Sequence, residues 1–348
     1  MLDIRFMERA LELARLGLGR VAPNPLVGAV LVQDGMILGE GYHEVFGGPH
    51  AEVRAVEDAL RRGNEQRLKS STLFVNLEPC SHHGKTPPCT DLILRYGIPK
   101  VVVANTDPFP AVNGTGIERL RAAGVEVQVG IEAEAGRWLN RRFFKFHEAK
   151  RPWILLKWAA SLDGFLGAKT NDPVGRRVSG SEAHRLVHRW RSEESAIAVG
   201  SATALNDNPQ LTVREWPGRS PVRILFDRTG RVLGDLHLFD GSVRTIRFSQ
   251  KIVGPTTGTE EIRLEEGSHF YRDAFASLYD LGLQSVLVEG GSVTLNNLIS
   301  ENLWDEARIF TAPIRLGSGV PPVSIQGKSI STEKIGDDLL TILLPHQH

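Results

Sequence analysis

The part of this sequence best suited to chemistry consists of one histidine, one glutamate and two cysteines. They occur as His50-Ala51-Glu52, as Pro79-Cys80 and as Cys89, and the 348 residues hold no other cysteine. One imidazole and two thiolates supply three ligands of a tetrahedral zinc ion, which leaves the fourth position to water. The spacing therefore predicts a catalytic zinc bound by His50, Cys80 and Cys89.

Glu52 adds the proton carrier that such a zinc ion needs. Zinc lowers the pKa of its water, and a nearby carboxylate can take that proton and return it to a departing amine. This combination is typical of zinc-dependent base deaminases, in which the glutamate is not a ligand. The apolar stripe Val53, Ala55, Val56, Ala59 and Leu60 predicts a helix with His50 and Glu52 in its first turn.

Two alternatives concern the same cysteines. A disulfide between Cys80 and Cys89 would need an oxidising compartment, but residues 1–14 have the acidic, amphipathic pattern of a helix and not of a targeting segment. Paired cysteines inside cells more often bind metal or act in catalysis. His82 and His83, which lie between the cysteines, could compete as ligands.

The overall composition excludes some classes of protein. The 41 basic and 41 acidic residues cancel, and the pI is near 7.2, which is not typical of a protein that binds nucleic acid through its net charge. No apolar run approaches the roughly 18 residues of a transmembrane helix. We therefore expect a cytoplasmic enzyme with small-molecule substrates and no nucleic-acid or membrane partner.

The first part of the chain alternates expected strands with expected helices. A hairpin is predicted from 27–33 and 36–39, with its turn at Asp34-Gly35. Further strands are expected at 71–77, 100–105 and 125–129, and helices from His50 onward and at 90–95, 116–123 and 135–145. This alternation predicts a mainly parallel sheet in a three-layer sandwich.

A polar stretch that ends at Pro152 marks a domain boundary. We expect a first domain over 1–146, a linker over 147–152 and a second domain over 153–348. In the second domain, strands are expected at 153–158, 195–199, 222–226 and 285–288, helices at 182–191, 274–281 and 295–299, and an edge strand or tail from Ile330 onward. No fixed-period repeat is present, which indicates two different domains.

The second domain has chemistry of its own. In 285–292 (SVLVEGGS), two glycines lie between an expected strand and an expected helix, where a dinucleotide pyrophosphate could meet the helix N-terminus. A tight turn explains the same glycines equally well. Arg191 and Arg214 could together bind a phosphate monoester, although Arg191 is equally compatible with a solvated helix position.

Several longer motifs resemble one family along nearly the whole chain, the bifunctional deaminase/reductases of riboflavin biosynthesis. The eight-residue interval between the cysteines, which contains 84–88 (GKTPP), is more specific than the short spacing of nucleoside deaminases. The motifs that carry the resemblance are 23–28 (PNPLVG), 49–52 (PHAE), 78–89 (EPCSHHGKTPPC), 157–164 (KWAASLDG), 207–214 (DNPQLTVR) and 289–291 (EGG).

The resemblance implies an α/β protein with a cytidine-deaminase-like three-layer αβα domain followed by a dihydrofolate-reductase-like α/β domain. The first would deaminate 2,5-diamino-6-(5-phosphoribosylamino)pyrimidin-4(3H)-one, and the second would reduce the ribosyl chain of the product to ribityl with NADPH. It also implies that Zn²⁺ is bound by His50, Cys80 and Cys89, and that Glu52 is catalytic. Substrate contacts in the deaminase would be Asn24, Lys85 and Asp107.

In the reductase, the resemblance implies contacts to both ligands. Substrate contacts would be Lys157, Gly175, Arg191, Leu211, Arg214 and Glu289. Cofactor contacts would be Ala159, Arg177, Thr203, Asp207, Arg228, Gly291, Ser292, Val293, Thr294, Leu295, Asn296 and Asn297. Arg228 follows an expected strand, where an arginine can meet the 2′-phosphate of NADPH or serve as a surface turn residue. Lys157, Asp207 and Glu289 are all chemically able to protonate the reductase substrate.

The chain departs from the family pattern at three positions. Phe109 stands where the family usually has Asn, and Gly175 and Arg177 stand where Ser and Trp are common. The first departure concerns substrate recognition in the deaminase domain, and the others concern the ligand contacts of one reductase loop.

Two rival hypotheses remain at this point. A deaminase that acts on nucleic-acid bases shares the zinc centre but binds flanking nucleotides through basic and aromatic surface. Alternatively, the second domain could be a degenerate partner-binding or dimerisation module, although Lys157, Arg191, Arg214 and Glu289 are all in place. We expect a homo-oligomer, because symmetric oligomers are common among such enzymes.

Overall fold

The computed structural model describes residues 2–81, 87–110, 112–168, 178–253, 258–267 and 269–346. It divides into two compact units, Met1–Ala149 and Lys150–His348. The last helix of the first unit continues to Ala149, within the expected linker, and the first strand of the second unit begins at Trp153. Among the helices of the described residues, none is long and apolar enough to span a membrane.

The first unit contains one mixed five-stranded sheet with the order β2-β1-β3-β4-β5. Its elements are α1 (Leu2–Arg15), β1 (Gly28–Gln33), β2 (Met36–Tyr42), α2 (Ala51–Arg61), η1 (Glu65–Ser70), β3 (Thr72–Leu77), α3 (Cys89–Tyr96), β4 (Lys100–Asn105), α4 (Thr115–Ala122), β5 (Glu126–Val129), α5 (Ala133–Leu139) and α6 (Arg141–Ala149). β1 pairs antiparallel with both β2 and β3, whereas β3, β4 and β5 are parallel. Four of the five strands therefore run in the same direction and only β1 opposes them, which confirms the prediction of a mainly parallel sheet except at β1.

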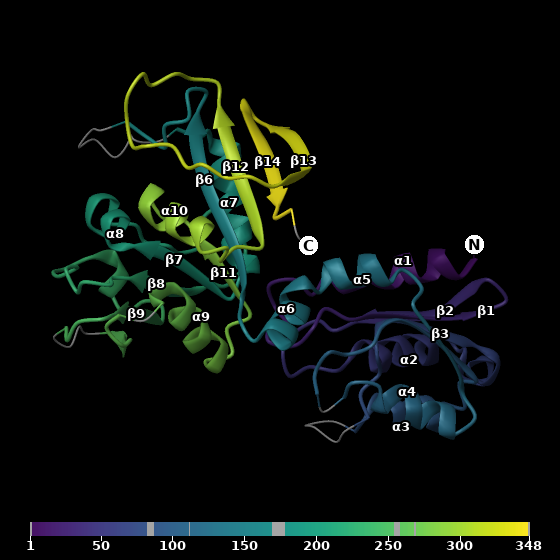
Figure 1. Ribbon diagram of the computed structural model, residues 1–348. Helices are drawn as coiled ribbons and strands as arrows, with labels where there is room; N and C mark the ends of the chain where they lie inside the picture. Colours follow the sequence, from purple (N-terminus) through teal and green to yellow (C-terminus); the bar gives the residue numbers. More distant parts are fainter. Residues whose placement is uncertain are drawn as a thin grey trace. The chain divides into compact units, whose positions relative to one another are not determined.

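Helices cover both faces of this sheet, as the three-layer prediction requires (Figure 1). On one face, α2, α3 and α4 pack on β-strand residues such as Leu31, Val75 and Val103, which are fully buried. On the other face, α1 and α5 pack on Val30, Phe74 and the other strand residues whose side chains point to that side of the sheet. Alternate strand residues point to opposite faces, so each strand contributes to both cores.

Close backbone packing fixes α2, the helix that begins after His50 and carries Glu52. A side chain on Gly39 of β2 would place its Cβ 2.4 Å from the carbonyl oxygen of Ala55 in α2. Only glycine therefore allows α2 to approach β2 this closely. The preceding hairpin turns at Asp34 and Gly35, both with positive φ, and this confirms the turn predicted from the sequence.

The single helix expected at 135–145 was wrong, because α5 and α6 are separate helices that meet at Asn140. The Asn140 side chain is buried; its Oδ1 accepts from the backbone N–H of Leu26 and its Nδ2 donates to the Leu26 carbonyl oxygen. An asparagine side chain that satisfies a distant backbone segment favours a helix end over a helix interior.

The second unit contains one nine-stranded sheet with the order β10-β9-β8-β7-β11-β6-β12-β14-β13. Its elements are β6 (Trp153–Ser161), α7 (Ser181–Glu193), β7 (Ala196–Gly200), α8 (Ser201–Asp207), β8 (Val222–Phe226), η2 (His237–Phe239), β9 (Thr245–Ser249), β10 (Thr259–Arg263), α9 (Phe270–Asp280), β11 (Ser285–Val288), α10 (Ser292–Ser300), β12 (Glu306–Ala312), β13 (Lys328–Ile335) and β14 (Asp338–Leu344). The strands from β10 to β12 are parallel, and the β13–β14 hairpin adds antiparallel pairs.

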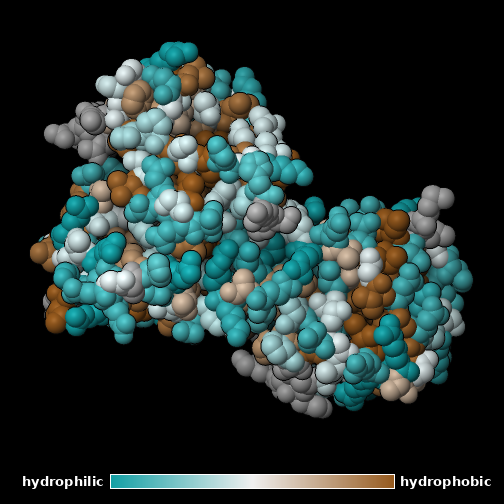
Figure 2. Space-filling view, viewed as in Figure 1, coloured by the Kyte–Doolittle hydropathy of each residue, from teal (hydrophilic) through white to brown (hydrophobic). Residues whose placement is uncertain are grey.

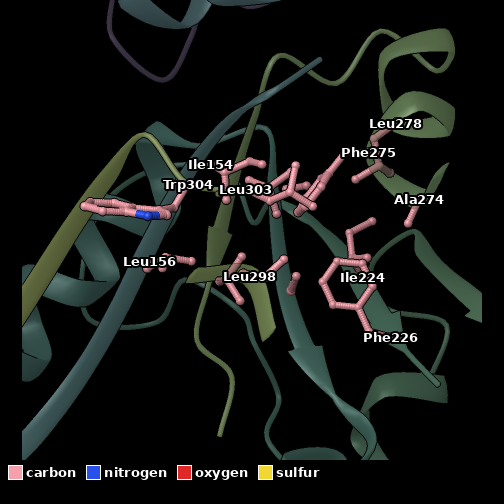
Figure 3. Packing of buried hydrophobic residues seen from close by; sticks show 14 of the residues in the cluster. Ile154, Leu156, Ile224, Phe226, Ala274, Phe275, Leu278, Leu298, Leu303 and Trp304 are labelled. Carbon is pink, nitrogen blue, oxygen red and sulfur yellow. The ribbon is translucent and has the colours of Figure 1, made fainter. Parts of the chain in front are cut away.

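This sheet also has an apolar core on each face. Figure 3 shows the larger core, in which Phe275 and Leu278 of α9 and Leu298 of α10 meet strand residues such as Ile154 and Ile224. On the opposite face, α7 and α8 pack against the strand residues that point to that side of the sheet, including Leu155, Ile197 and Leu287. Helices on both faces of a parallel sheet leave the carboxyl ends of its strands available for ligands.

Three strands, β9, β10 and β12, were not predicted from the sequence. β12 contains the buried pair Glu306–Arg308, with 2.7 Å between Arg308 Nε and Glu306 Oε1, and β9 contains the fully buried Arg247. Buried charges interrupt the apolar run that marks a buried strand. The expected edge or tail after Ile330 is partly correct: β13 is an edge strand, but β14 lies between β12 and β13.

Two candidate active sites

The first unit brings together the three residues predicted to bind zinc. His50 precedes α2 as its N-cap residue, Cys80 follows β3, and Cys89 is the first residue of α3. His50 Nδ1 lies 3.3 Å from Cys89 Sγ and 3.6 Å from Cys80 Sγ. The three ligand atoms all lie within 4.8 Å of one another.

These separations fit a tetrahedral zinc site. Bond lengths of about 2.3 Å to sulfur and about 2.0 Å to nitrogen place tetrahedral N and S ligands about 3.5 Å apart. The donor set of one imidazole and two thiolates is also one that zinc prefers. The residues present therefore fit the metal, without rearrangement of the elements that carry them.

The protein groups around the cysteines favour a thiolate. A hydrogen bond with Cys89, assisted by His50, lowers the pKa of the Cys80 thiol to about 4. The same bond and burial raise the pKa of the Cys89 thiol. Thiolate is the form of cysteine that binds metal.

Glu52 lies in the first turn of α2, beside the three predicted ligands. Its side chain is only 4% exposed, and it interacts with the Cys89 thiol. Burial is the main reason why the pKa of the Glu52 carboxyl is raised. A raised pKa suits a group that must both accept and release a proton near neutral pH.

Asn24 is hydrogen-bonded to His43, a histidine next to His50 whose role was not predicted from the sequence. Asn24 Nδ2 lies 3.0 Å from His43 Nε2, and His43 Nδ1 lies 3.0 Å from the Pro49 carbonyl oxygen. A carbonyl oxygen can only accept, so His43 Nδ1 carries the proton and Nε2 accepts from Asn24. Burial lowers the pKa of His43, which keeps this ring neutral. The His43 and His50 rings meet edge to face at 5.7 Å.

Glu78, two residues before Cys80, joins the metal loop to the loop that carries Asp107. Its Oε2 accepts from the backbone N–H groups of Asp107 and Gly114, at 3.1 and 2.9 Å. Its Oε1 accepts from the N–H groups of Gly116 and Ile117 at the start of α4, at 2.8 and 3.3 Å. One buried carboxylate thereby holds the backbone around both a predicted ligand and a predicted substrate contact.

Asp107 is buried, and this raises the pKa of its carboxyl to about 6. Its Oδ1 accepts from the N–H of Phe109 at 2.8 Å. The Phe109 ring is 40% exposed and packs 5.3 Å from the His147 ring. Lys85, His82 and His83 lie outside the described residues.

The second unit holds a largely buried group of three charged residues at the centre of its sheet, and the side chains of Arg191 and Glu289 are 11% and 12% exposed. Both Glu289 oxygens accept from Arg191, Oε1 from Nε at 2.8 Å and Oε2 from Nη2 at 2.9 Å. Burial alone would raise the pKa of Glu289. The positive charges of Arg191 and Lys157 outweigh this effect and lower the pKa to about 2. Burial lowers the pKa of the neighbouring Lys157 ammonium, an effect that Glu289 opposes. Arg191 is thus part of this largely buried group and not a solvated helix residue.

Two glycine turns converge beside this group, at the carboxyl ends of β7 and β11. A Cβ on Gly200 would lie 2.2 Å from Thr294 Oγ1, and one on Gly291 would lie 3.2 Å from Thr203 Oγ1. Gly291 is the N-cap of α10, which has no side-chain cap. The first N–H groups of an uncapped helix suit a phosphate oxygen.

The remaining residues of the predicted cofactor segment differ in exposure. Val293 is 68% exposed, whereas the Leu295 side chain is fully buried in the core and could contact a ligand only through its backbone. Ala159 lies in β6, and Asp207 is the last residue of α8. Leu211 has a buried side chain and a positive φ, so its contact would also be a backbone contact.

Arg228 follows β8 and is exposed. Its Nε donates to Gln250 Oε1 at 2.7 Å, and Gln250 Nε2 donates to the Glu265 carbonyl oxygen at 2.8 Å. A buried glutamine thereby holds the guanidinium in one place at the carboxyl end of the sheet. Gly175 and Arg177 lie outside the described residues.

Family models match both parts of the chain. The model described as "Cytidine and deoxycytidylate deaminase zinc-binding region" matches residues 1–105, and the model described as "RibD C-terminal domain" matches residues 152–341. The riboflavin biosynthesis protein RibD of Aquifex aeolicus is 38% identical over 354 residues, which cover 97% of each chain. RibD of Escherichia coli is 37% identical, over 91% of this chain and 89% of its own.

Solved structures match over the full length. A Thermotoga maritima diaminohydroxyphosphoribosylaminopyrimidine deaminase/5-amino-6-(5-phosphoribosylamino)uracil reductase is 38% identical, with a TM-score of 0.88 over 99% of both chains. RibD of Acinetobacter baumannii, at 31% identity, also gives a TM-score of 0.88 over 99% of both chains.

Proposed function

Because the chain belongs to the RibD family of riboflavin-biosynthesis proteins, we propose that each unit performs one of two consecutive reactions. The chain is a zinc-dependent deaminase and an NADPH-dependent reductase of riboflavin biosynthesis. The first unit would deaminate 2,5-diamino-6-(5-phosphoribosylamino)pyrimidin-4(3H)-one. The second would reduce the ribosyl chain of 5-amino-6-(5-phosphoribosylamino)uracil to ribityl.

The observation that carries this assignment is the ligand set of His50, Cys80 and Cys89 with Glu52 buried beside it. Bound zinc supplies the Lewis acid that makes water nucleophilic near neutral pH. Glu52 takes the proton of the attacking water and delivers it to the departing amino group. Asn24, Asp107 and Lys85 bind the substrate, and His43 orients the Asn24 amide.

In the second unit, Glu289, Arg191 and Arg214 bind the substrate, together with Leu211 and Gly175. NADPH supplies the hydride, and its contacts are Ala159, Arg177, Thr203, Asp207, Arg228 and the segment 291–297. Of the three candidate proton donors, Asp207 is assigned to the cofactor, and Glu289 is ionised by its bidentate pair with Arg191 and has no proton to give. The lowered pKa of Lys157 supports this lysine as the donor.

Zinc removal tests whether deamination belongs to the first unit and reduction to the second. We expect a chelator to abolish ammonia release from the diamino substrate, because only the first unit needs the metal. NADPH-dependent reduction of the deaminated substrate should continue at its normal rate, and added zinc should restore ammonia release. Ammonia release that persists after the metal content falls to zero would contradict the zinc assignment.

Arg228 is proposed to select NADPH over NADH. Replacement of Arg228 with Ala should weaken NADPH binding by roughly 10–100-fold, the value of a charged hydrogen bond to phosphate, and leave NADH binding unchanged. Fluorescence titration of both cofactors measures this difference. Arg231→Ala, a nearby exposed arginine, is the matched control. An NADPH affinity equal to that of the wild type would remove Arg228 from the cofactor site.

We also propose that the protein acts in the cytoplasm on small molecules and binds neither nucleic acid nor membrane, in keeping with its balanced charge. Self-association is proposed as well. Figure 2 shows hydrophobic side chains gathered on the viewed face of the first unit, and exposed large hydrophobic residues of that unit include Leu16, Met36, Val45 and Phe46. Exposed apolar patches often mark protein interfaces.

A further inference from the structure

The backbone that carries Arg214 has no regular secondary structure and is held by side chains. Residues 208–214 belong to neither helix nor strand. The carbonyl oxygen of Thr212 accepts from Arg191 Nη1, the N–H of Val213 donates to Ser220 Oγ, and the N–H of Arg214 donates to His188 Nδ1, each at 3.1 Å. Three successive backbone groups are therefore positioned by three side chains from elsewhere in the unit.

Two of these side chains come from one face of α7. Residues three apart on a helix lie on the same face, so His188 and Arg191 reach the segment side by side. Arg191 also binds both oxygens of Glu289. This helix face therefore connects the backbone of Arg214 to the buried carboxylate of the proposed substrate site.

The His188 ring must be neutral, with its proton on Nε2. A backbone N–H can only donate, so Nδ1 holds the lone pair that accepts from Arg214. The ring is 1% exposed. Burial, with the charges of Arg191 and Arg214, lowers the pKa of His188 to about 4, and this keeps the ring uncharged at neutral pH.

The same tautomer argues against a second metal site. His184, His188 and Glu215 place possible ligand atoms within 4.8 Å of one another. Ligation through His188 Nε2 would require loss of its proton while Nδ1 still accepts from Arg214, which is the costly imidazolate form. Ligation through Nδ1 would break the bond to Arg214. The geometry therefore favours a hydrogen-bonding role for His188.

We propose that His188 is a positioning residue of the reductase, which fixes the backbone at Arg214 so that its guanidinium meets the phosphate of the substrate. The inference rests on the proposed substrate contact of Arg214. The Arg214 side chain is itself oriented by a 2.8 Å hydrogen bond from Nη1 to Thr212 Oγ1, within the same held segment. Loss of the His188 acceptor would leave the Arg214 N–H without that partner and release the segment.

A matched pair of polar variants tests this role. The Asn side-chain oxygen can occupy the place of His Nδ1, whereas the longer Gln places its oxygen near Nε2, away from the Arg214 N–H. We expect His188→Gln to raise the KM for the reductase substrate about tenfold or more, with kcat and NADPH affinity little changed. His188→Asn should restore a KM close to that of the wild type. Deamination by the same chains is the internal control.

Further variants separate the possible outcomes. His184→Leu should leave the KM unchanged, whereas equal damage from His184→Leu and His188→Gln would support a metal site instead. Equal KM values for His188→Gln and His188→Asn would overturn the proposal, as would a Gln variant that fails to fold or loses NADPH binding and kcat together. If Arg214→Ala leaves the KM unchanged, the substrate contact of Arg214 itself fails. If Arg214→Ala raises the KM and His188→Gln does not, only the role of His188 fails.

Discussion

Replacement of Glu52 with Gln is expected to lower kcat for deamination by roughly 10²–10⁴-fold, the usual contribution of a general acid–base. The glutamine amide would keep the shape of the side chain but could not carry the proton from water to the leaving amine. The zinc ligands His50, Cys80 and Cys89 are unchanged, so the metal content should stay at that of the wild type. Ammonia release and metal analysis of the same preparation measure both quantities.

A control for this variant is available on the same helix. Glu57 is exposed on α2 and pairs with Arg54 at the surface. Glu57→Gln should therefore leave deamination unchanged, because the side chain faces solvent. Ammonia release at the normal rate by the Glu52 variant would show that another group moves the proton. Loss of zinc from it would show a structural role instead.

Replacement of Glu289 with Gln is expected to lower kcat/KM for reduction by about 10²-fold or more. The change leaves the buried Arg191 without its counter-charge, a loss of about 3–5 kcal/mol for a broken buried pair. It also removes the charge that opposes the lowered pKa of Lys157, so this ammonium would lose its proton more readily. The free energy of unfolding of the second unit should fall together with the activity.

The surface pair Arg244–Glu260 provides the matched control for the buried pair. It has the same bidentate geometry, at 2.7 and 2.9 Å, but its side chains are 42% and 51% exposed. Glu260→Gln should change stability by less than about 1 kcal/mol and leave reduction unaffected. Thermal unfolding and NADPH oxidation assays on both variants, with ammonia release as a reference, make the comparison. Similar effects of the two changes would contradict the role of the buried pair.

The zinc centre could be predicted from the sequence because its residues have few alternative uses. Imidazole, thiolate and carboxylate groups at this spacing fit few roles other than a zinc site with a proton carrier, which are the roles predicted for His50, Cys80, Cys89 and Glu52. The structure brings the three predicted ligands close enough together to bind one metal ion. His43 and Glu78 could not be recognised in the same way. Their roles depend on a carbonyl oxygen and on backbone N–H groups that only the fold places beside them.

The fold could be predicted where pattern and turn chemistry agree. The β1–β2 hairpin follows from Asp34-Gly35, which can adopt the positive φ of its turn. The antiparallel pairing of β1 with β3 could not be read from alternating strands and helices, because strand direction depends on the path of the connection. Likewise, the helix break at Asn140 depends on Leu26, a residue 114 positions away.

The assignment of two consecutive reactions to one chain is tested most directly by the mass of its products. The purified protein would receive the diamino substrate, first without and then with NADPH. The account predicts that ammonia is lost in both cases, and that the product gains two further hydrogens only when NADPH is present. A reduced product that retains both amino groups of the substrate, or a substrate that remains unchanged in both cases, would contradict it.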